Sequence, residues 1–362
     1  MNNIAFYYQE FEQQLSEIEQ YINSIELQKS MVREIEKNED AIRKITNSAV
    51  LYCESIKKVS STPIQYNAVI ISIYGCFEQY IDNIFECYCS NLCEVTTMLK
   101  ELPTTLRDKQ IKKLGDFLTN PQRYKNYELT PEDAIRNAYI SYENPKDGLQ
   151  KNKNLLLTHG GNLGINQISD LARDFGVNNL IPRIVSHFIF KNYFVEKGIH
   201  SEETYGRTIS GDPKSLFEEL DSLVSERNNV AHGWVETRYN FAIIKEKWLN
   251  YLRCLAHVLQ EILWCSFAEF VYKSKKLYCL GKPIKVYDKH IVCINNGEAV
   301  LHKGDYVVAV KDEMVKVILI ETIQIEGELV ECTDSINKNV GLGLTKRLDL
   351  NVDDNYFIYL FK

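Results

Sequence analysis

The fold is organised around one stretch, Ser225-Glu226-Arg227-Asn228-Asn229-Val230-Ala231-His232-Gly233. An apolar stripe leads into it at alternating spacings of four and three residues: Leu216, Leu220, Leu223, Arg227 and Val230. This spacing is typical of an amphipathic helix that packs against other helices. Arg227 therefore lies on the inward stripe, where an unpaired guanidinium would be costly.

His232 and Gly233 mark where this helix ends. His232 follows Arg227 by five residues, an offset of about 140° on a helix of about 3.6 residues per turn. Gly233 suits the left-handed residue just past a helix end. The helix dipole at that end favours the charged imidazole, and the neighbouring amides can hold one tautomer. In the alternative interpretation, Arg227 and the two asparagines only cap the helix.

Composition limits the class of protein. The chain has 362 residues, which is more than a single hydrophobic core usually holds. Its formal net charge of −7 excludes a basic nucleic-acid coat, but not a nuclease that meets RNA briefly. Ten cysteines with no signal peptide indicate reduced, intracellular thiols. No apolar run reaches the roughly 18 residues of a membrane span, so we expect a cytoplasmic protein that contacts no membrane.

The chain divides into three parts by its patterns. Residues 1–62 carry a heptad seam that predicts a long helix, paired either with a second helix folded back as a hairpin or with another subunit. Residues 63–273 form a helical domain, in which the patterns after the first long helix predict helices near 104–119, 131–140, 166–175, 184–194, 215–231 and 238–272, with a polar loop before 215. Residues 274–362 contain six or so short strands, which predict a small β-barrel or β-sheet domain.

Few other side chains form a candidate site. Cys87, Cys89 and Cys93 share one helix but lack the further ligands that zinc needs, so we predict neither a metal nor a cofactor. Glu78 lies one position beyond an apolar stripe, either as a solvated carboxylate or as a partner that orients Arg227 or His232. The basic run that includes Lys151 and Lys153 is either a solvated segment or a contact for phosphate.

The motif resembles that of a known superfamily. Arg227 and His232 match the R-x4–6-H motif of the HEPN superfamily, and the string RNNVAHG is similar to its bacterial RiboL-PSP-HEPN branch. Two further stretches resemble that branch, the aromatic-Glu helix Tyr74–Tyr80 and the Gly-Gly-Asn-Leu loop His159–Leu163. The resemblance covers about residues 63–272 and reaches neither the heptad helix nor the β domain. The fold class is therefore mainly α, a HEPN-type helical bundle between these two parts.

The resemblance implies a dimer in which two motif helices meet, and RNA cleavage that needs no metal. The residues suit this chemistry. A neutral His232 can take the proton of the ribose 2′-OH, and the partner's His232 can protonate the leaving 5′-oxygen. Arg227 would stabilise the charged phosphorane, while Asn228 would position the phosphate or the imidazole, with Asn229 in support. The products would be a 2′,3′-cyclic phosphate and a 5′-OH.

Such proteins commonly act as toxins or as abortive-infection effectors in anti-phage defence. The resemblance therefore implies a regulating partner, either an antitoxin or a defence complex, reached through the β domain or the N-terminal helix. Two other functions stay open. The chain could be a non-catalytic HEPN scaffold that binds nucleotides or assembles a complex. It could also be a regulatory subunit that recruits a separate enzyme.

Overall fold

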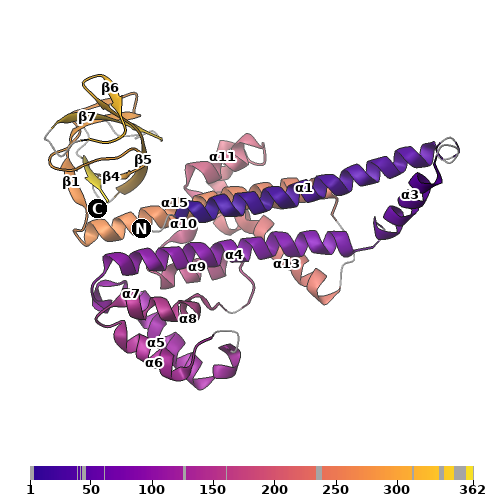
Figure 1. Ribbon diagram of the computed structural model, residues 1–362, viewed down its shortest axis with the longest axis horizontal. Helices are drawn as coiled ribbons and strands as arrows, with labels where there is room; N and C mark the ends of the chain where they lie inside the picture. Colours follow the sequence, from indigo (N-terminus) through magenta and orange to yellow (C-terminus); the bar gives the residue numbers. More distant parts are fainter. Residues whose placement is uncertain are drawn as a thin grey trace. The chain divides into compact units, whose positions relative to one another are not determined.

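The computed structural model describes residues 4–38, 40, 42, 46–60, 62–124, 128–159, 161–233, 239–311, 314–333, 338–345 and 356–361. Two compact units divide the chain, Met1–Ile262 and Leu263–Lys362. The first unit is helical and the second is mostly β-sheet (Figure 1), so the expected fold class is confirmed. The division between the two units falls inside the last helix, and residues 1–62 lie within the first unit.

The first unit consists of helices joined by short connections. They are α1 (Ile4–Lys37), α3 (Asn47–Ser60), α4 (Ile64–Val95), α5 (Thr104–Thr119), α6 (Pro131–Ile140), α7 (Pro145–Gly148), α8 (Lys153–Leu157), α9 (Ile165–Asp174), α10 (Leu180–Val185), α11 (Phe188–Glu196), α12 (Glu202–Gly211), α13 (Glu218–His232), α14 (Phe241–Ile244) and the first part of α15 (Asn250–Lys273). The 3₁₀ turns are η1 (Leu99–Glu101), η2 (Pro121–Tyr124), η3 (Gln150–Asn152) and η4 (Pro213–Phe217), and η5 (Lys245–Leu249) is a π-helical segment.

The long helices α1 and α4 pack lengthwise (Figure 1). The heptad seam of α1 is buried at Ile4, Phe11, Leu15, Ile22, Ile25 and Val32. Phe11 stacks on Tyr80 of α4 with 4.7 Å between the ring centroids. Helix α3 also packs on α1. The seam is therefore covered within the chain, by α4 and α3.

Helix α4 is the central element of this unit. Most of its length is buried, and the hydroxyl of Tyr80 donates to the carbonyl oxygen of Ala256 at 2.7 Å. The motif helix α13 packs against α4. The side chains that α4 presents to α13 therefore form the base of the candidate site.

Three expectations about helices need correction. The helix expected over 184–194 is two helices, because α10 ends at Val185 and His187 caps α11, its Nδ1 accepting from the Ile189 N–H at 3.3 Å. The expected polar loop contains α12, which Ser201 caps by accepting from the Thr204 N–H at 3.2 Å. The helix expected from 238 begins at Phe241 and passes through the π-helical η5; residue 238 itself lies outside the described residues.

The described residues of the second unit form an antiparallel sheet of eight strands, more than the six or so expected. They are β1 (Tyr278–Gly281), β2 (Lys285–Tyr287), β3 (Ile291–Asn295), β4 (Tyr306–Lys311), β5 (Met314–Ile325), β6 (Glu328–Val330), β7 (Asn339–Leu344) and β8 (Tyr356–Leu360), in the order β1-β8-β4-β5-β7-β3-β2 with β6 on β5. Strand β5 pairs with β4 along its first half and with β6 and β7 along its second. The hydrophobic core of this second unit includes Val292, Ile294, Val307, Ile320 and Leu342.

One described stretch, Phe241–Lys273, is long and apolar enough to cross a membrane by length and composition. However, 61% of its most apolar window is buried inside the molecule. This burial is typical of a core helix, which passes the same test for length and composition.

Candidate functional site

The motif helix α13 ends as the sequence predicts. Its inward face buries Leu220, Leu223, Glu226 and Val230, and three acidic residues in its first turn complement the helix dipole. Gly233 follows the last helical residue with φ of 74°, and its N–H bonds back to the carbonyls of Asn229 and Val230. His232 is thereby held at the exposed C-terminal end of the helix.

Arg227 is half-buried and lies on an aromatic ring. Its Cζ is 5.2 Å from the ring centroid of Tyr74 on α4. Its Nη1 donates to Oδ1 of Asn162 and to Oδ1 of Asn228, each at 3.3 Å. The Nδ2 of Asn162 closes the triangle by donating to Asn228 at 2.9 Å. Among the described residues these partners are two amides and an aromatic ring. Because they are neutral, they do not balance the charge of the guanidinium, which can therefore bind an anion.

Tyr74 joins Arg227 to the loop that carries Asn162. Its hydroxyl accepts from the backbone N–H of Leu163 at 2.8 Å. Burial raises the pKa of Tyr74 above its usual value, and a hydrogen bond to Glu78 raises this pKa further. The carboxylate of Glu78 therefore orients Tyr74, which in turn supports Arg227. Glu78 acts on the arginine through this tyrosine.

A polar stripe on α4 anchors the rest of this loop. It continues from Tyr74 and Glu78 at spacings of four residues, which lie on one face of a helix. Asp82 faces His159, with 3.8 Å between Oδ1 and Nε2, and Glu86 forms an ion pair with Lys153. The stripe therefore holds Lys153, His159 and Leu163 against α4.

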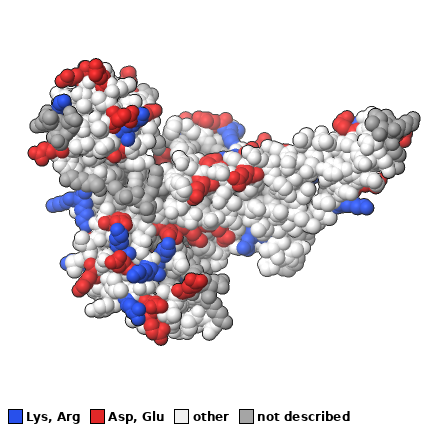
Figure 2. All heavy atoms as spheres, viewed as in Figure 1, with Lys and Arg blue, Asp and Glu red and all other residues white. Residues whose placement is uncertain are grey.

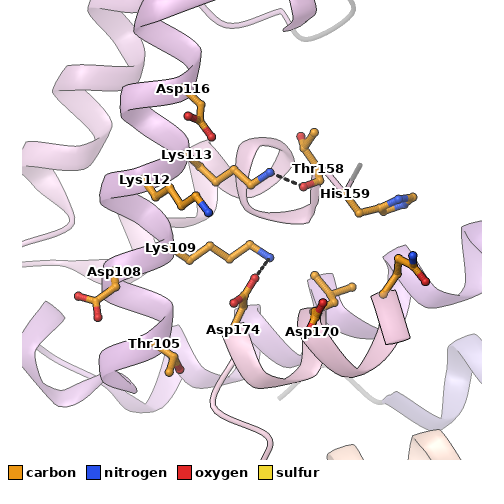
Figure 3. A pocket seen from close by; sticks show the side chains of 12 residues that line it. Thr105, Asp108, Lys109, Lys112, Lys113, Asp116, Thr158, His159, Asp170 and Asp174 are labelled. Carbon is orange, nitrogen blue, oxygen red and sulfur yellow. Dashed lines mark hydrogen bonds and ion pairs between the residues drawn. The ribbon is translucent and has the colours of Figure 1, made fainter. Parts of the chain in front are cut away.

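A pocket of about 450 Å³ lies beside the same loop, between α5, α9 and His159 (Figure 3). Three lysines of α5 reach into it, Lys109, Lys112 and Lys113. Lys113 donates from Nζ to the carbonyl oxygen of Thr158 at 2.5 Å and so ties the loop to α5. Four aspartates also line the pocket: Asp108, Asp116, Asp170 and Asp174. Its charge is therefore mixed, and it offers no clear selectivity for an anion.

The burial of Lys109 in this pocket should make the stability of the protein depend on pH. The Nζ of Lys109 lies 3.1 Å from Oδ2 of Asp174, and burial lowers the pKa of the lysine. The unfolded chain then binds more protons than the folded one between this lowered pKa and the ordinary lysine value of about 10.4, so stability rises with pH there. We expect wild type to gain stability relative to Lys109→Met as the pH rises towards about 10.4. Urea unfolding at several pH values measures this, and a constant difference between the proteins would contradict it.

The other residues predicted for the site differ in their relation to Arg227. Asn228 belongs to the hydrogen-bonded triangle, whereas Asn229 contributes its backbone carbonyl to the helix end. Lys151 is exposed and Lys153 is engaged by Glu86. In the view of Figure 2, lysines and arginines gather over α5, α7 and α8 with acidic residues among them. No described group of three or more His, Cys, Asp or Glu residues could hold a metal ion.

Sequence reasoning missed three partners of the motif. Tyr66 lies on the broad apolar face of α4, and Tyr74 begins the aromatic-Glu stretch that resembles the family, but the sequence assigned neither tyrosine a polar contact. The Tyr66 hydroxyl donates to Oε1 of Glu226 at 2.6 Å, and both side chains are buried. Asn162 could have been found, since it lies in the Gly-Gly-Asn-Leu loop.

A helical unit with an arginine and a histidine at the end of one internal helix is a HEPN-type domain, a class generally associated with ribonucleases. The chain belongs to the RiboL-PSP-HEPN family, whose family model matches residues 9–264. This match begins within α1, so our expectation that the resemblance starts near residue 63 was wrong. The match includes most of the heptad helix α1, which packs against α4.

No curated protein sequence matches the chain. Among solved structures, the chain is similar to the selenomethionine variant of the C-terminal domain of a protein described as a U32 peptidase from Geobacillus thermoleovorans. The two are 16% identical with a TM-score of 0.18, over 23% of this chain and 95% of that one. A similarity at this level says nothing about fold or function.

Proposed function

We propose that this protein is a metal-independent endoribonuclease of HEPN type, acting in the cytoplasm as a toxin or an anti-phage abortive-infection effector. One observation carries the proposal. Arg227 is fixed on Tyr74 by neutral partners, and His232 is presented at the exposed end of the same helix. A fixed cation and a titratable imidazole are what cleavage through the ribose 2′-OH requires.

The reaction uses these side chains in turn. Neutral His232 takes the 2′-OH proton, and the 2′-oxygen forms a bond to phosphorus. The bond from phosphorus to the 5′-oxygen then breaks, and the partner's His232, as an imidazolium, gives its proton to that oxygen. Arg227 stabilises the charge on the phosphorane, and Asn228 keeps the guanidinium in place. The products are a 2′,3′-cyclic phosphate and a 5′-OH.

A dimer explains the placement of the two residues. The five-residue separation turns Arg227 towards α4, while His232 is exposed at the helix end. Two copies of α13 that face each other would bring each histidine towards the other chain's arginine. We therefore propose a homodimer through the HEPN helices, with the β unit or α1 available to an antitoxin or a defence complex.

The test is the chemistry of the cut ends. Wild-type protein incubated with total RNA in EDTA should release fragments that carry 2′,3′-cyclic phosphates and 5′-OH groups. DNA of the same sequence should stay intact because it has no 2′-OH. Cleavage that requires Mg²⁺, or that leaves 3′-OH ends, would contradict the proposal.

The second candidate is a non-catalytic scaffold or a regulatory subunit of a defence complex. The hydrogen bonds from Arg227 to Asn162 and Asn228 favour it, because they would also stabilise a purely structural helix end. This candidate predicts no cleavage of any RNA in EDTA and a stable complex with a separate enzyme. The end-mapping experiment distinguishes the two.

A further inference from the structure

A second polar pocket of about 380 Å³ lies between α1, the start of α4 and residues 239–241. Its lining includes two cations of α1, Lys29 and Arg33, and two tyrosines, Tyr66 and Tyr239. Cations beside aromatic rings are the side chains with which proteins hold single-stranded nucleic acid, through its phosphates and its bases.

Lys29 occupies a position of the heptad seam at which an apolar residue is expected. Its neighbours on the seam, Ile25 and Val32, are buried, whereas Lys29 is half-buried with its Nζ 4.8 Å from the ring centroid of Phe241. Arg33 follows one helical turn later and is exposed. An apolar side chain would continue the seam, so the pocket explains this lysine better than helix packing does.

The described residues that line this pocket give it a positive charge. Its lining carboxylate, Glu26, accepts from Nζ of Lys245 at 2.9 Å, so another lysine already balances it. Lys29 and Arg33 remain as the cations that face the pocket. The pocket beside α5 differs, because four aspartates line it together with its lysines. A phosphate is therefore favoured at Lys29 and Arg33.

This pocket is linked to the motif helix. The Tyr66 hydroxyl in its wall donates to Glu226, the residue directly before Arg227. Tyr66 and Tyr74 lie on the same helix, eight residues apart in sequence, or about 12 Å along the helix axis at about 1.5 Å per residue. Arg227 lies over Tyr74. A few nucleotides of single-stranded RNA span this separation.

We infer that the pocket binds a phosphate of the RNA strand that is cut at Arg227 and His232, a few nucleotides from the scissile bond. Lys29 and Arg33 hold the phosphate, and the adjoining base packs against Tyr239. The inference rests on the proposed ribonuclease function, and it identifies single-stranded RNA as the substrate class.

Binding to uncleavable RNA tests this inference separately from catalysis. Two full-length proteins are compared, wild type and the double variant Lys29→Met/Arg33→Gln. Each is titrated with a 2′-O-methyl oligonucleotide of about 12 nucleotides and, separately, with a dinucleotide. Binding is measured by fluorescence anisotropy at several salt concentrations. We expect the variant to bind the long oligonucleotide at least about tenfold more weakly, with a log–log salt slope smaller by about 0.7, since one lost phosphate contact removes about 0.7. Both proteins should bind the dinucleotide equally.

The control is Lys191→Met on α11, which removes a lysine paired with Glu202 outside this pocket and should leave binding unchanged. The inference is wrong if the double variant binds the long oligonucleotide like wild type. It is also wrong if a free nucleoside monophosphate binds at Lys29 and Arg33 as tightly as the RNA does. Cleavage of total RNA by wild type is measured in parallel. If wild type does not cleave RNA but its binding of the oligonucleotide depends on Lys29 and Arg33, the ribonuclease proposal is wrong and the binding site is supported.

Discussion

Arg227→Ala and His232→Ala should each reduce the rate of RNA cleavage by about 100- to 10,000-fold. The histidine variant loses the group that moves the proton, and the arginine variant loses the cation that stabilises the phosphorane. His232 is exposed at the helix end, so its removal should leave the fold intact. Arg227→Lys keeps the charge but not the planar fork, and should also lose most of the activity. Rates measured in EDTA at saturating RNA, with circular dichroism as a check on folding, decide the outcome.

The matched control is His302→Ala in the second unit, where the histidine is exposed and lies beside Asp305. It should cleave RNA like wild type.

Mixing wild type with the His232→Ala variant tests whether the site combines two chains. Because the reaction uses His232 of both subunits, a mixed dimer has only one of the two histidines, and an excess of the variant should lower the activity of wild type. A His232→Ala preparation that cleaves as fast as wild type would contradict the mechanism.

The features that could be predicted are those that depend on residues close together in the sequence, such as helix ends and apolar spacing. The end of α13 could be predicted because Gly233 provides the left-handed residue that closes a helix. Helices α5 and α6 begin and end where their patterns predict; Pro103 directly precedes α5, and Pro131 is the first residue of α6. The heptad seam predicted α1, although a single seam could not show that its partner is α4.

The partners of Arg227 could not be predicted in the same way. Asn162 lies 65 residues from it in sequence, and Tyr74 lies on a mostly buried helix, where the sequence does not show which side chain it contacts. Periodicity shows which face of a helix is inward, but not which inward residue carries a polar contact. Helix α12 was missed for a related reason. Gly206 and Gly211 indicated a loop, whereas the cap at Ser201 and the acidic first turn stabilise a helix.

Tyr66→Phe should destabilise the helical unit by about 2 kcal/mol, because it removes the donor from a buried carboxylate. Tyr66 and Glu226 are only 4% and 8% exposed, so water cannot replace the lost hydrogen bond at low cost. Burial and the bond to Glu226 both raise the pKa of Tyr66, which keeps the phenol protonated as the donor. In a unit of this size the loss corresponds to a fall in Tm of about 4–8 °C. Thermal unfolding followed by helical circular dichroism measures it.

The double variant Tyr66→Phe/Glu226→Leu shows whether the carboxylate is the cause. Removing both polar groups leaves nothing buried and unpaired, so the double variant should be more stable than Tyr66→Phe alone. A Tm of Tyr66→Phe equal to that of wild type would mean that the hydrogen bond contributes nothing. Because Glu226 directly precedes Arg227, this pair also ties the start of α4 to the motif. A loosened pair should therefore weaken RNA cleavage even where the arginine and the histidine are both present.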